Sequence, residues 1–355
     1  MTSSPMNVRI AGNTLQMGAL TITFHRTLRI PDNGRQYPLP PSLGAFPLRH
    51  VEDYKDRVPE NWRERGGVFL PMYQREAMWI SFNGPAHQPR AVQVAVGKVC
   101  ALTGKPWSNT LGDPSQKGGQ NYLVTPPQPW LDGICAGHGT IKQFVAMPLG
   151  TGVTVEGQVT GEESVGGLQL QVFDPKPGRF PDAPPPPPFP RAPAMGFPDT
   201  GSFGPPLAYG MAGAIPPPMY APAPCAAPAP RQQATMGLAA GGKMQQKLYP
   251  DPHGRDTWDL TQSGRCFVHL CNSELYSAIT GEPAPASPVD ANSYKAHGFP
   301  WFQLYDEGAP ALDTTPTLAG VKSLGELDAE HGAPPEAVNE SIFGKMKRLV
   351  RDGVW

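Results

Sequence analysis

Two short segments place cysteine and histidine at spacings that suit metal binding. They read Cys135-x-x-His138 and Cys266-x-x-His269-x-Cys271. Thiolate and imidazole are preferred ligands of zinc, and four of them would complete a tetrahedral site. If the second segment is a strand, however, Cys266 points to one face and the other two ligands to the opposite face. Cysteine is also commonly buried as a small apolar residue, so we expect core positions, no metal and no cofactor.

The first of these segments lies in a glycine-rich stretch that could present Cys135 as a nucleophile with His138 as its base. A separation of three residues is weak support, because the fold usually brings catalytic cysteine and histidine together from distant positions. The chain also has no phosphate-binding loop, no Gly-x-Ser-x-Gly elbow, no His-Glu-x-x-His helix and no dinucleotide-binding glycine pattern. We therefore assign no catalytic residue, and the sequence favours a protein that is not an enzyme.

Two segments place large aromatic side chains beside a carboxylate, PWLD at residues 129–132 and PWFQLYD at residues 300–306. This composition suits stacking on a sugar ring or a contact that anchors a protein partner. The alternative is that these rings fill the core. The residues that we predict to bind a ligand or a partner are Trp130, Asp132, His138, Trp301, Tyr305 and Asp306.

A proline-rich stretch divides the chain. Residues 181–230 contain 18 of the 46 prolines and three charged residues. Proline fixes φ and has no N–H, so this tether favours extended polyproline II over helix or sheet. A plain spacer needs no aromatic rings, so we predict that its rings dock on this chain, a neighbouring copy or a partner, with an ordinary linker as the alternative. The rings are Phe189, Phe197, Phe203, Tyr209 and Tyr220, together with Phe180 directly before this stretch.

The overall composition argues against some classes of protein. Only 17% of the 355 residues are charged and the formal net charge is −1, which leaves no broad basic field for nucleic acid. The amino terminus lacks a secretory pattern, and five scattered cysteines favour reduced thiols, so we expect a cytoplasmic protein. The uncharged run 200–230 is not expected to span a membrane, because its prolines and glycines prevent a regular helix.

Most of the apolar runs that must position these residues read as strands. Residues 21–30 alternate, with Ile22, Phe24 and, unexpectedly, Arg26 on one face. Further strand-like runs recur up to residue 175 at intervals of roughly ten to twenty residues. The fold class predicted is mainly β with a minor α+β content, as two antiparallel β-sandwich or barrel-like modules joined by the proline-rich tether.

Within this fold the alternating residues 153–158 and 168–172 are expected to pair as a hairpin. Short helices are expected within residues 51–65, at 273–280 after a cap at Asn272 or Ser273, and at the amphipathic 342–351.

Four segments make up the predicted domain organisation. Residues 1–50 would form an N-terminal strand and arm, 51–175 a β-rich domain, 176–235 the tether, and 236–355 a second β-rich module. The hexamers ALTGKP at residues 101–106 and AITGEP at 278–283 match at four positions, and each is followed at a distance by Pro-Trp, at residues 129–130 and 300–301. A duplication of one module would explain this match, and the alternative is two unrelated turns that both need glycine.

Four strings outside the tether carry a family resemblance. They are TFHRTLRIPDNGRQYPLPPSLGAFPL, IKQFVAMPLGTGVTVEGQVTGEESVGGLQLQVF, MGLAAGGKMQQKLYPDP and HGFPWFQLYD. They resemble those of a bacterial and fungal family of uncharacterised proteins, some of whose members are labelled integral membrane proteins. The resemblance implies no activity, cofactor or site residue.

From the sequence we expect a non-enzymatic protein that forms a homo-oligomer or scaffolds a protein partner, with the tether packed along the assembled surface. The alternative is an enzyme or a ligand-binding module, hydrolytic or carbohydrate-directed, with its site near Trp130, Asp132 and His138 or near Trp301 and Asp306.

Overall fold

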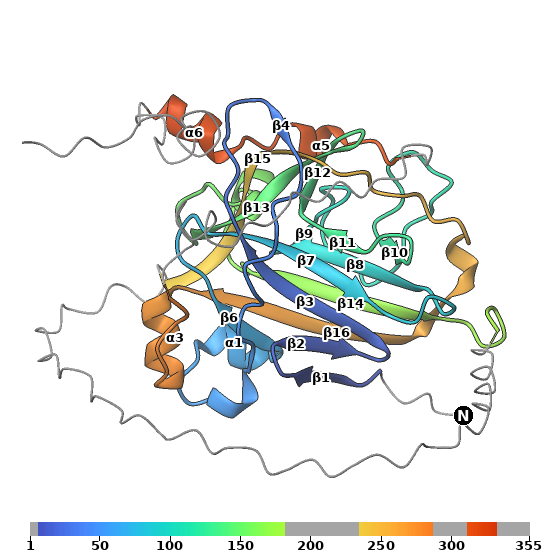
Figure 1. The fold of residues 1–355 in the computed structure, drawn as a ribbon, viewed down its shortest axis with the longest axis horizontal. Coiled ribbons are helices and arrows are strands. Elements are labelled where there is room, and N and C mark those ends of the chain that lie inside the picture. Colours follow the sequence, from blue (N-terminus) through green and yellow to red (C-terminus); the bar gives the residue numbers. More distant parts are fainter. Residues whose placement is uncertain (1–5, 182–233, 287–310, 332–355) are drawn as a thin grey trace, which may run out of the picture. The chain divides into compact units, whose positions relative to one another are not determined.

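The strands of this protein join into one large, mostly antiparallel sheet (Figure 1). The computed structural model describes residues 6–181, 234–286 and 311–331. Sixteen strands of these segments belong to the sheet. They are β1 (Val8–Ala11), β2 (Thr14–Met17), β3 (Leu20–Thr27), β4 (Gln36–Tyr37), β5 (Arg49–His50), β6 (Val68–Pro71), β7 (Ala77–Asn83), β8 (Arg90–Val96), β9 (Val99–Cys100), β10 (Leu123–Thr125), β11 (Trp130–Leu131), β12 (Gly133–Gly137), β13 (Thr140–Pro148), β14 (Leu168–Pro175), β15 (Thr235–Gln245) and β16 (Trp258–Cys271).

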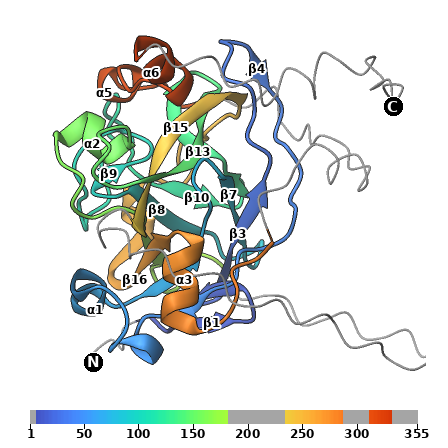
Figure 2. The ribbon, with the colours of Figure 1, turned by 90° about the vertical axis from the view of Figure 1, so that its left-hand side faces the viewer.

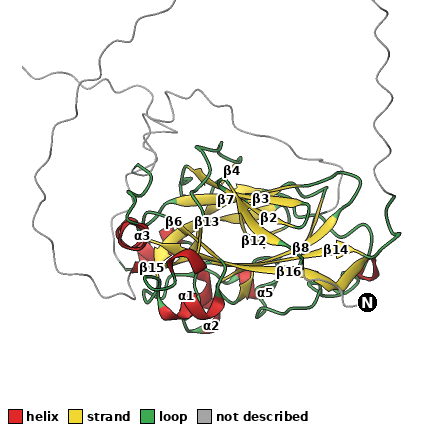
Figure 3. Ribbon diagram, turned by 90° about the horizontal axis from the view of Figure 1, so that it is seen from below, coloured by secondary structure: helices red, strands yellow, loops and turns green. Residues whose placement is uncertain are grey.

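The sheet bends so that its two halves share one core. Its main path runs β1-β2-β3-β7-β13-β15-β16-β14-β8-β10, and in the described residues no pairing joins β10 back to β1. Figure 3 shows β2, β3 and β7 in one layer, with β8, β14 and β16 in another. A single apolar cluster contains buried residues of both layers, among them Ile22, Ile80, Val94, Leu170 and Val268. Burial of these faces therefore holds the two halves together.

The predicted mainly β structure is confirmed, but the strands on the two sides of the proline-rich stretch do not form separate modules. β15 and β16 follow that stretch, and they pair with β13 and β14, which precede it. Val145 lies opposite Ala239, for example, and Leu170 lies opposite Cys266. The strands join one sheet because their apolar faces complete the same core. Periodicity in a sequence shows which segments become strands but not which distant strand each one pairs with.

Strand β3 has the predicted alternation, and its unexpected arginine has a buried partner. Arg26 lies on the core-facing side, where its Nη2 is 2.6 Å from Glu76 Oε1. The two side chains are 12% and 3% exposed, and Glu76 also accepts a hydrogen bond from the Tyr73 N–H at 2.9 Å. Arg26 is tolerated there because a buried charge needs a paired and hydrogen-bonded partner.

Residues 153–158 begin a helix, and the predicted strand there is wrong. Helix α2 (Val155–Thr160) starts after Thr154, whose side chain accepts the Gly157 N–H, and ends at Gly161 with φ +77°. A side-chain cap at one end and a left-handed glycine at the other stabilise a helix. The expected hairpin partner, β14, pairs instead with β8 and β16.

Two short helices cover the side of β6 and β16 that faces away from the main core (Figure 2). They are α1 (Glu60–Arg65), which follows the 3-10 turn η1 (Glu52–Tyr54), and α3 (Ser273–Thr280). Trp62, Phe69 and Tyr276 pack together there. The cap of α3 at Asn272 and its end at Gly281 are as predicted. Among the described helices none is long and apolar enough to cross a membrane.

The two matching hexamers have different conformations. Residues 101–106 form a turn that follows β9, whereas residues 278–283 run through the end of α3. A shared Thr-Gly pair therefore closes a turn in one case and a helix in the other. The amphipathic segment 342–351 lies outside the described residues.

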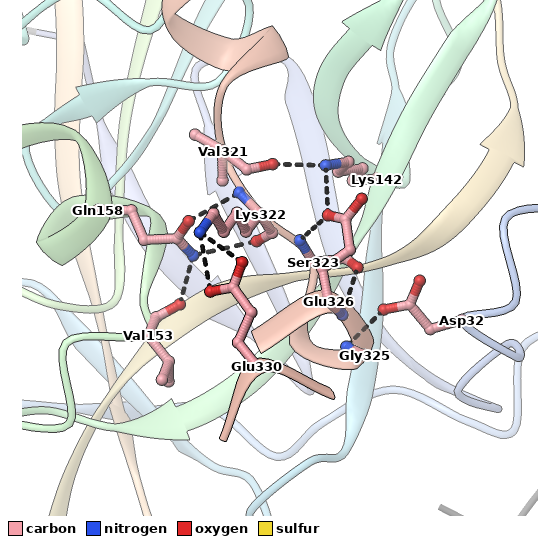
Figure 4. A network of polar contacts seen from close by, with 10 residues as sticks. All are labelled: Asp32, Lys142, Val153, Gln158, Val321, Lys322, Ser323, Gly325, Glu326 and Glu330. Atoms are coloured by element: carbon pink, nitrogen blue, oxygen red, sulfur yellow. Dashed lines mark hydrogen bonds and ion pairs between the residues drawn. The ribbon is translucent and has the colours of Figure 1, made fainter. Parts of the chain in front are cut away.

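Residues 311–331 contain the helices α5 (Pro316–Ala319) and α6 (Leu324–Glu330). Polar contacts attach this segment to the rest of the fold (Figure 4). The Lys142 ammonium of β13 donates to the Val321 carbonyl and lies 3.4 Å from Glu326 Oε2. The Asp32 carboxylate accepts the Gly325 N–H at 2.7 Å. These contacts make the segment an integral part of the folded body, although it follows a long stretch of chain.

Replacing the buried lysine tests this anchoring. Lys142→Met keeps the aliphatic stem but leaves the Val321 carbonyl without its charged donor, which costs about 1.5–3 kcal/mol of unfolding free energy. Urea denaturation measures the loss, and Lys322→Met in the half-exposed pair with Glu330 is the control, with an effect within about 0.5 kcal/mol. Equal stability of Lys142→Met and the parent protein would contradict the anchoring role.

Candidate ligand-binding face

One side of β1, β2, β3, β7 and β11 faces away from the core. Alternation along each strand sends residues such as Ile22 and Ile80 inward and their neighbours outward. The register aligns the outward side chains in three rows across the strands, which we call the outer face. The rows are Thr14, Thr23, Ser81 and Trp130; Arg9, Gln16, Thr21 and Asn83; and Ala45, His25 and Trp79.

The outer face is rich in hydroxyl and amide groups and poor in charge. Arg9 is the only arginine, lysine or carboxylate in the three rows, and its Nε donates to Gln16 Oε1 at 2.8 Å. Within the described part of the chain, the side chains of Thr21, Thr23 and Asn83 make no hydrogen bond. Neighbouring strands lie about 4.8 Å apart, so the rows offer closely spaced donors and acceptors to a bound molecule.

His25 is held between two serine hydroxyls on this face. Its Nδ1 lies 2.8 Å from Ser42 Oγ and its Nε2 lies 2.8 Å from Ser81 Oγ. The imidazole stacks on Trp79 with ring centroids 3.8 Å apart and planes 13° apart. Burial lowers the pKa of His25 to about 4, because desolvation disfavours the charged imidazolium. The ring is therefore neutral at physiological pH and can act as both donor and acceptor.

Trp130 and Asp132 lie together at the edge of the outer face. Trp130 is half-buried and lies opposite Ser81, whereas Asp132 is fully buried. In the described residues neither Asp132 oxygen nor Trp130 Nε1 has a hydrogen bond of normal geometry. Burial raises the pKa of Asp132 well above its usual range, and the nearby Trp130 indole N–H opposes this only in part. The carboxyl is a costly group to bury without a partner.

The other predicted site residues do not join this cluster. His138 is exposed in the turn between β12 and β13, where its Nδ1 lies 3.3 Å from Asp313 Oδ1. Its described polar contact is therefore with residues of the C-terminal segment rather than with Asp132. Trp301, Tyr305 and Asp306 lie outside the described residues, as do the tether rings from Phe189 to Tyr220.

The four cysteines in the described residues lie in the core and are not placed to act as nucleophiles. Cys100, Cys135, Cys266 and Cys271 are buried free thiols. Burial raises the pKa of Cys135 to about 11 and that of Cys266 to about 12, so both are neutral thiols rather than nucleophilic thiolates. The His269 imidazole stacks on the Trp62 indole of α1, with ring centroids 4.7 Å apart. The described residues contain no group of three or more His, Cys, Asp or Glu placed to hold a metal ion.

Sequence reasoning missed His25, Ser42 and Ser81. Ser42 lies 17 positions and Ser81 lies 56 positions after His25, and none of the three belongs to a motif. The one available signal was the alternation of β3, which places His25 and two threonines on its polar face. That pattern predicts the polar face of β3. It does not predict that β7 and the segment after β3 place Ser81 and Ser42 beside His25.

The chain was compared with protein-family models, with curated proteins and with solved structures. No family model, curated protein or solved structure matches it.

Replacing the buried carboxyl tests the burial of Asp132. A raised folded pKa means that the unfolded chain ionises first, so Asp132 costs stability increasingly as pH rises above its unfolded value near 3.8. Asp132→Asn removes the charged form, with a gain in unfolding free energy at pH 7.5 of about 1–3 kcal/mol, the usual cost of burying an unsatisfied polar group. This gain shrinks towards pH 3.5. Denaturant unfolding across this pH range measures it, with the exposed Asp53→Asn as control. A less stable Asp132→Asn at pH 7.5 would refute this reading.

Proposed function

We propose that the outer face binds a neutral, polyhydroxylated ligand, and that this ligand is a carbohydrate chain. The observation that carries the proposal is the row Thr14, Thr23 and Ser81, which ends at Trp130. Hydroxyl groups donate and accept, so they match the hydroxyls of a sugar, and the half-buried indole offers a surface for the apolar face of its ring.

The charge and polarity of the face favour this class over others. An anionic ligand would meet one cation, Arg9, which is already bonded to Gln16. An apolar ligand would cover the free hydroxyls of Thr21 and Thr23 without replacing their bonds to water, and unpaired buried polar groups are costly. A ligand with many hydroxyls and no charge avoids both penalties.

Isothermal titration with two neutral hexasaccharides, cellohexaose and chitohexaose, tests the proposal. We expect binding of at least one, and Thr23→Val, which replaces the hydroxyl with a methyl, weakens it about fivefold, or ~1 kcal/mol. Thr317→Val, on the exposed surface of α5, leaves the affinity unchanged. Absence of binding by both sugars at millimolar concentration, or unchanged affinity in Thr23→Val, would remove the proposal.

A second candidate function is self-assembly or scaffolding through the tether. The ring of Phe180, the first of the predicted series, lies 5.0 Å from His253 at 82°, an edge-to-face contact. Among described large apolar side chains only Leu260 is exposed, at 43%, so the tether rings rather than an apolar patch would join copies. In this proposal the tether rings connect β-sandwich-like bodies into a cytoplasmic homo-oligomer that needs no catalytic activity.

Deleting residues 181–230 separates these roles. If the tether joins copies, mass photometry of the full chain shows species larger than the 38.1 kDa protomer, and the deletion variant is reduced to protomers. Circular dichroism of the variant checks that the sheet is retained. A full-length chain found only as protomers would exclude self-assembly and leave the outer face unaffected.

A further inference from the structure

We propose that Ser81 is an acyl nucleophile, that His25 is its general base and that Ser42 positions the imidazole. The reaction inferred is hydrolysis of a carboxylic ester, and its alcohol portion would be the sugar that the outer face binds. Only this choice of substrate rests on the proposed function. The assignment of the nucleophile rests on the geometry of the three side chains alone.

The base lies between its two partners as acyl-transfer chemistry requires. His25 Nε2 lies 2.8 Å from Ser81 Oγ, within reach of the hydroxyl proton, and Nδ1 lies 2.8 Å from Ser42 Oγ. A nucleophile hydrogen-bonded to a base, which is oriented by a third group, is the recurring arrangement in serine hydrolases. Here a serine hydroxyl takes the place in which a carboxylate is more familiar.

The surroundings of His25 favour the productive tautomer. Ser42 Oγ already accepts a hydrogen bond from the Gly44 N–H at 3.2 Å, and its second lone pair can accept a hydrogen bond from a protonated Nδ1 at 2.8 Å. Nε2 is then unprotonated and accepts the Ser81 hydroxyl. Stacking on Trp79 fixes the plane of the ring, so the imidazole loses little freedom when a substrate binds.

The site is also open to a substrate. His25, Ser42 and Ser81 are each partly exposed, and Ser81 lies in the same row as the unbonded Thr23 hydroxyl and as Trp130. A sugar ester lying along this row would bring its acyl carbon to the nucleophile. No other described serine contacts an imidazole nitrogen.

The steps balance with water as the co-reactant. The Ser81 proton passes to His25 Nε2 while Oγ adds to the ester carbonyl carbon, and the carbonyl electron pair moves to oxygen. When that pair returns, the bond to the sugar oxygen breaks, and this oxygen takes the proton from Nε2. Water then repeats the sequence on the acyl-serine and releases a carboxylic acid. Because burial lowers the pKa of His25 to about 4, the base is weak and turnover is slow, so covalent labelling is the more sensitive measurement.

The test labels the full-length protein with a fluorophosphonate, whose phosphorus accepts Oγ as fluoride leaves, and maps the adduct by mass spectrometry. We expect an adduct on Ser81 that is absent in Ser81→Ala and reduced at least tenfold in His25→Gln. Ser42→Ala should lower the labelling rate and Ser42→Thr should restore it, whereas the exposed Ser108→Ala behaves as the parent. The rate should rise through pH 4 and stay level above it, which a purely structural histidine would not cause.

Circular dichroism and urea unfolding establish that each variant is folded. A folded parent protein without an adduct on Ser81, or with equal labelling in Ser81→Ala, overturns the proposal. Acetate release from glucose pentaacetate, lost in Ser81→Ala, supports the substrate class, and labelling of Ser81 without this release overturns that class alone. Labelling is measured without free sugar, so failure of hexasaccharide binding and failure of the nucleophile are told apart.

Discussion

The register between β3 and β7 is the constraint on which the outer face depends. In this pairing His25 lies opposite Trp79 and Thr23 opposite Ser81. A slip of one residue would turn every outward side chain into the core. The inward residues prevent this, because Ile22 and Phe24 are fully buried and Arg26 would lose its bonds to Glu76. Burial raises the pKa of Glu76 despite the attraction of Arg26, so this pair specifies the register at a cost in desolvation.

The extended arm, residues 28–48 between β3 and β5, supplies Ser42, the third residue of the candidate site. Its residues 43–46 continue the sheet beside β3, and the Phe46 N–H donates to the Phe24 carbonyl at 2.9 Å. Farther back the Gln143 amide of β13 donates to the Leu28 carbonyl and accepts the Ile30 N–H. The buried Gln143 amide thus satisfies both a backbone carbonyl and a backbone N–H of residues 28–30, which form no strand. It holds this segment in place as the backbone of a neighbouring strand would. Ser42 is therefore placed by the sheet, although it lies on a loop.

Local features of the fold were predictable from the sequence, and long-range ones were not. The alternation of β3 and the capped helix α3 depend on neighbouring residues, so their patterns appear directly. The pairing of β15 with β13 depends on which apolar faces complete a common core, and no local signal records that choice. Helix α2 is a local feature for which the sequence prediction is wrong. Alternation in residues 153–158 is compatible with a strand, but the Thr154 cap and Gly161 favour a helix.

The candidate site shows the same difference between local features, which the sequence predicts, and long-range contacts, which it does not. The sequence indicates Trp130 because a large aromatic side chain beside a carboxylate suits ligand binding. In the structure it is half-buried, lies opposite Ser81 and also packs against the apolar core. Asp132 is buried, and among the described residues its oxygens have no hydrogen bond of normal geometry. His138 lies beside Asp313 instead. His25 and Ser81 come from different strands, so only the register brings them together.

Nitrogen-15 NMR of the His25 imidazole across a pH titration tests this account most directly. An imidazole held between Ser42 and Ser81 and stacked on Trp79 stays neutral down to a midpoint near pH 4, with the proton on Nδ1 and the lone pair on Nε2. A midpoint near the ordinary value of about 6.5, with rapid exchange between the two tautomers, would show a solvated ring and contradict the account.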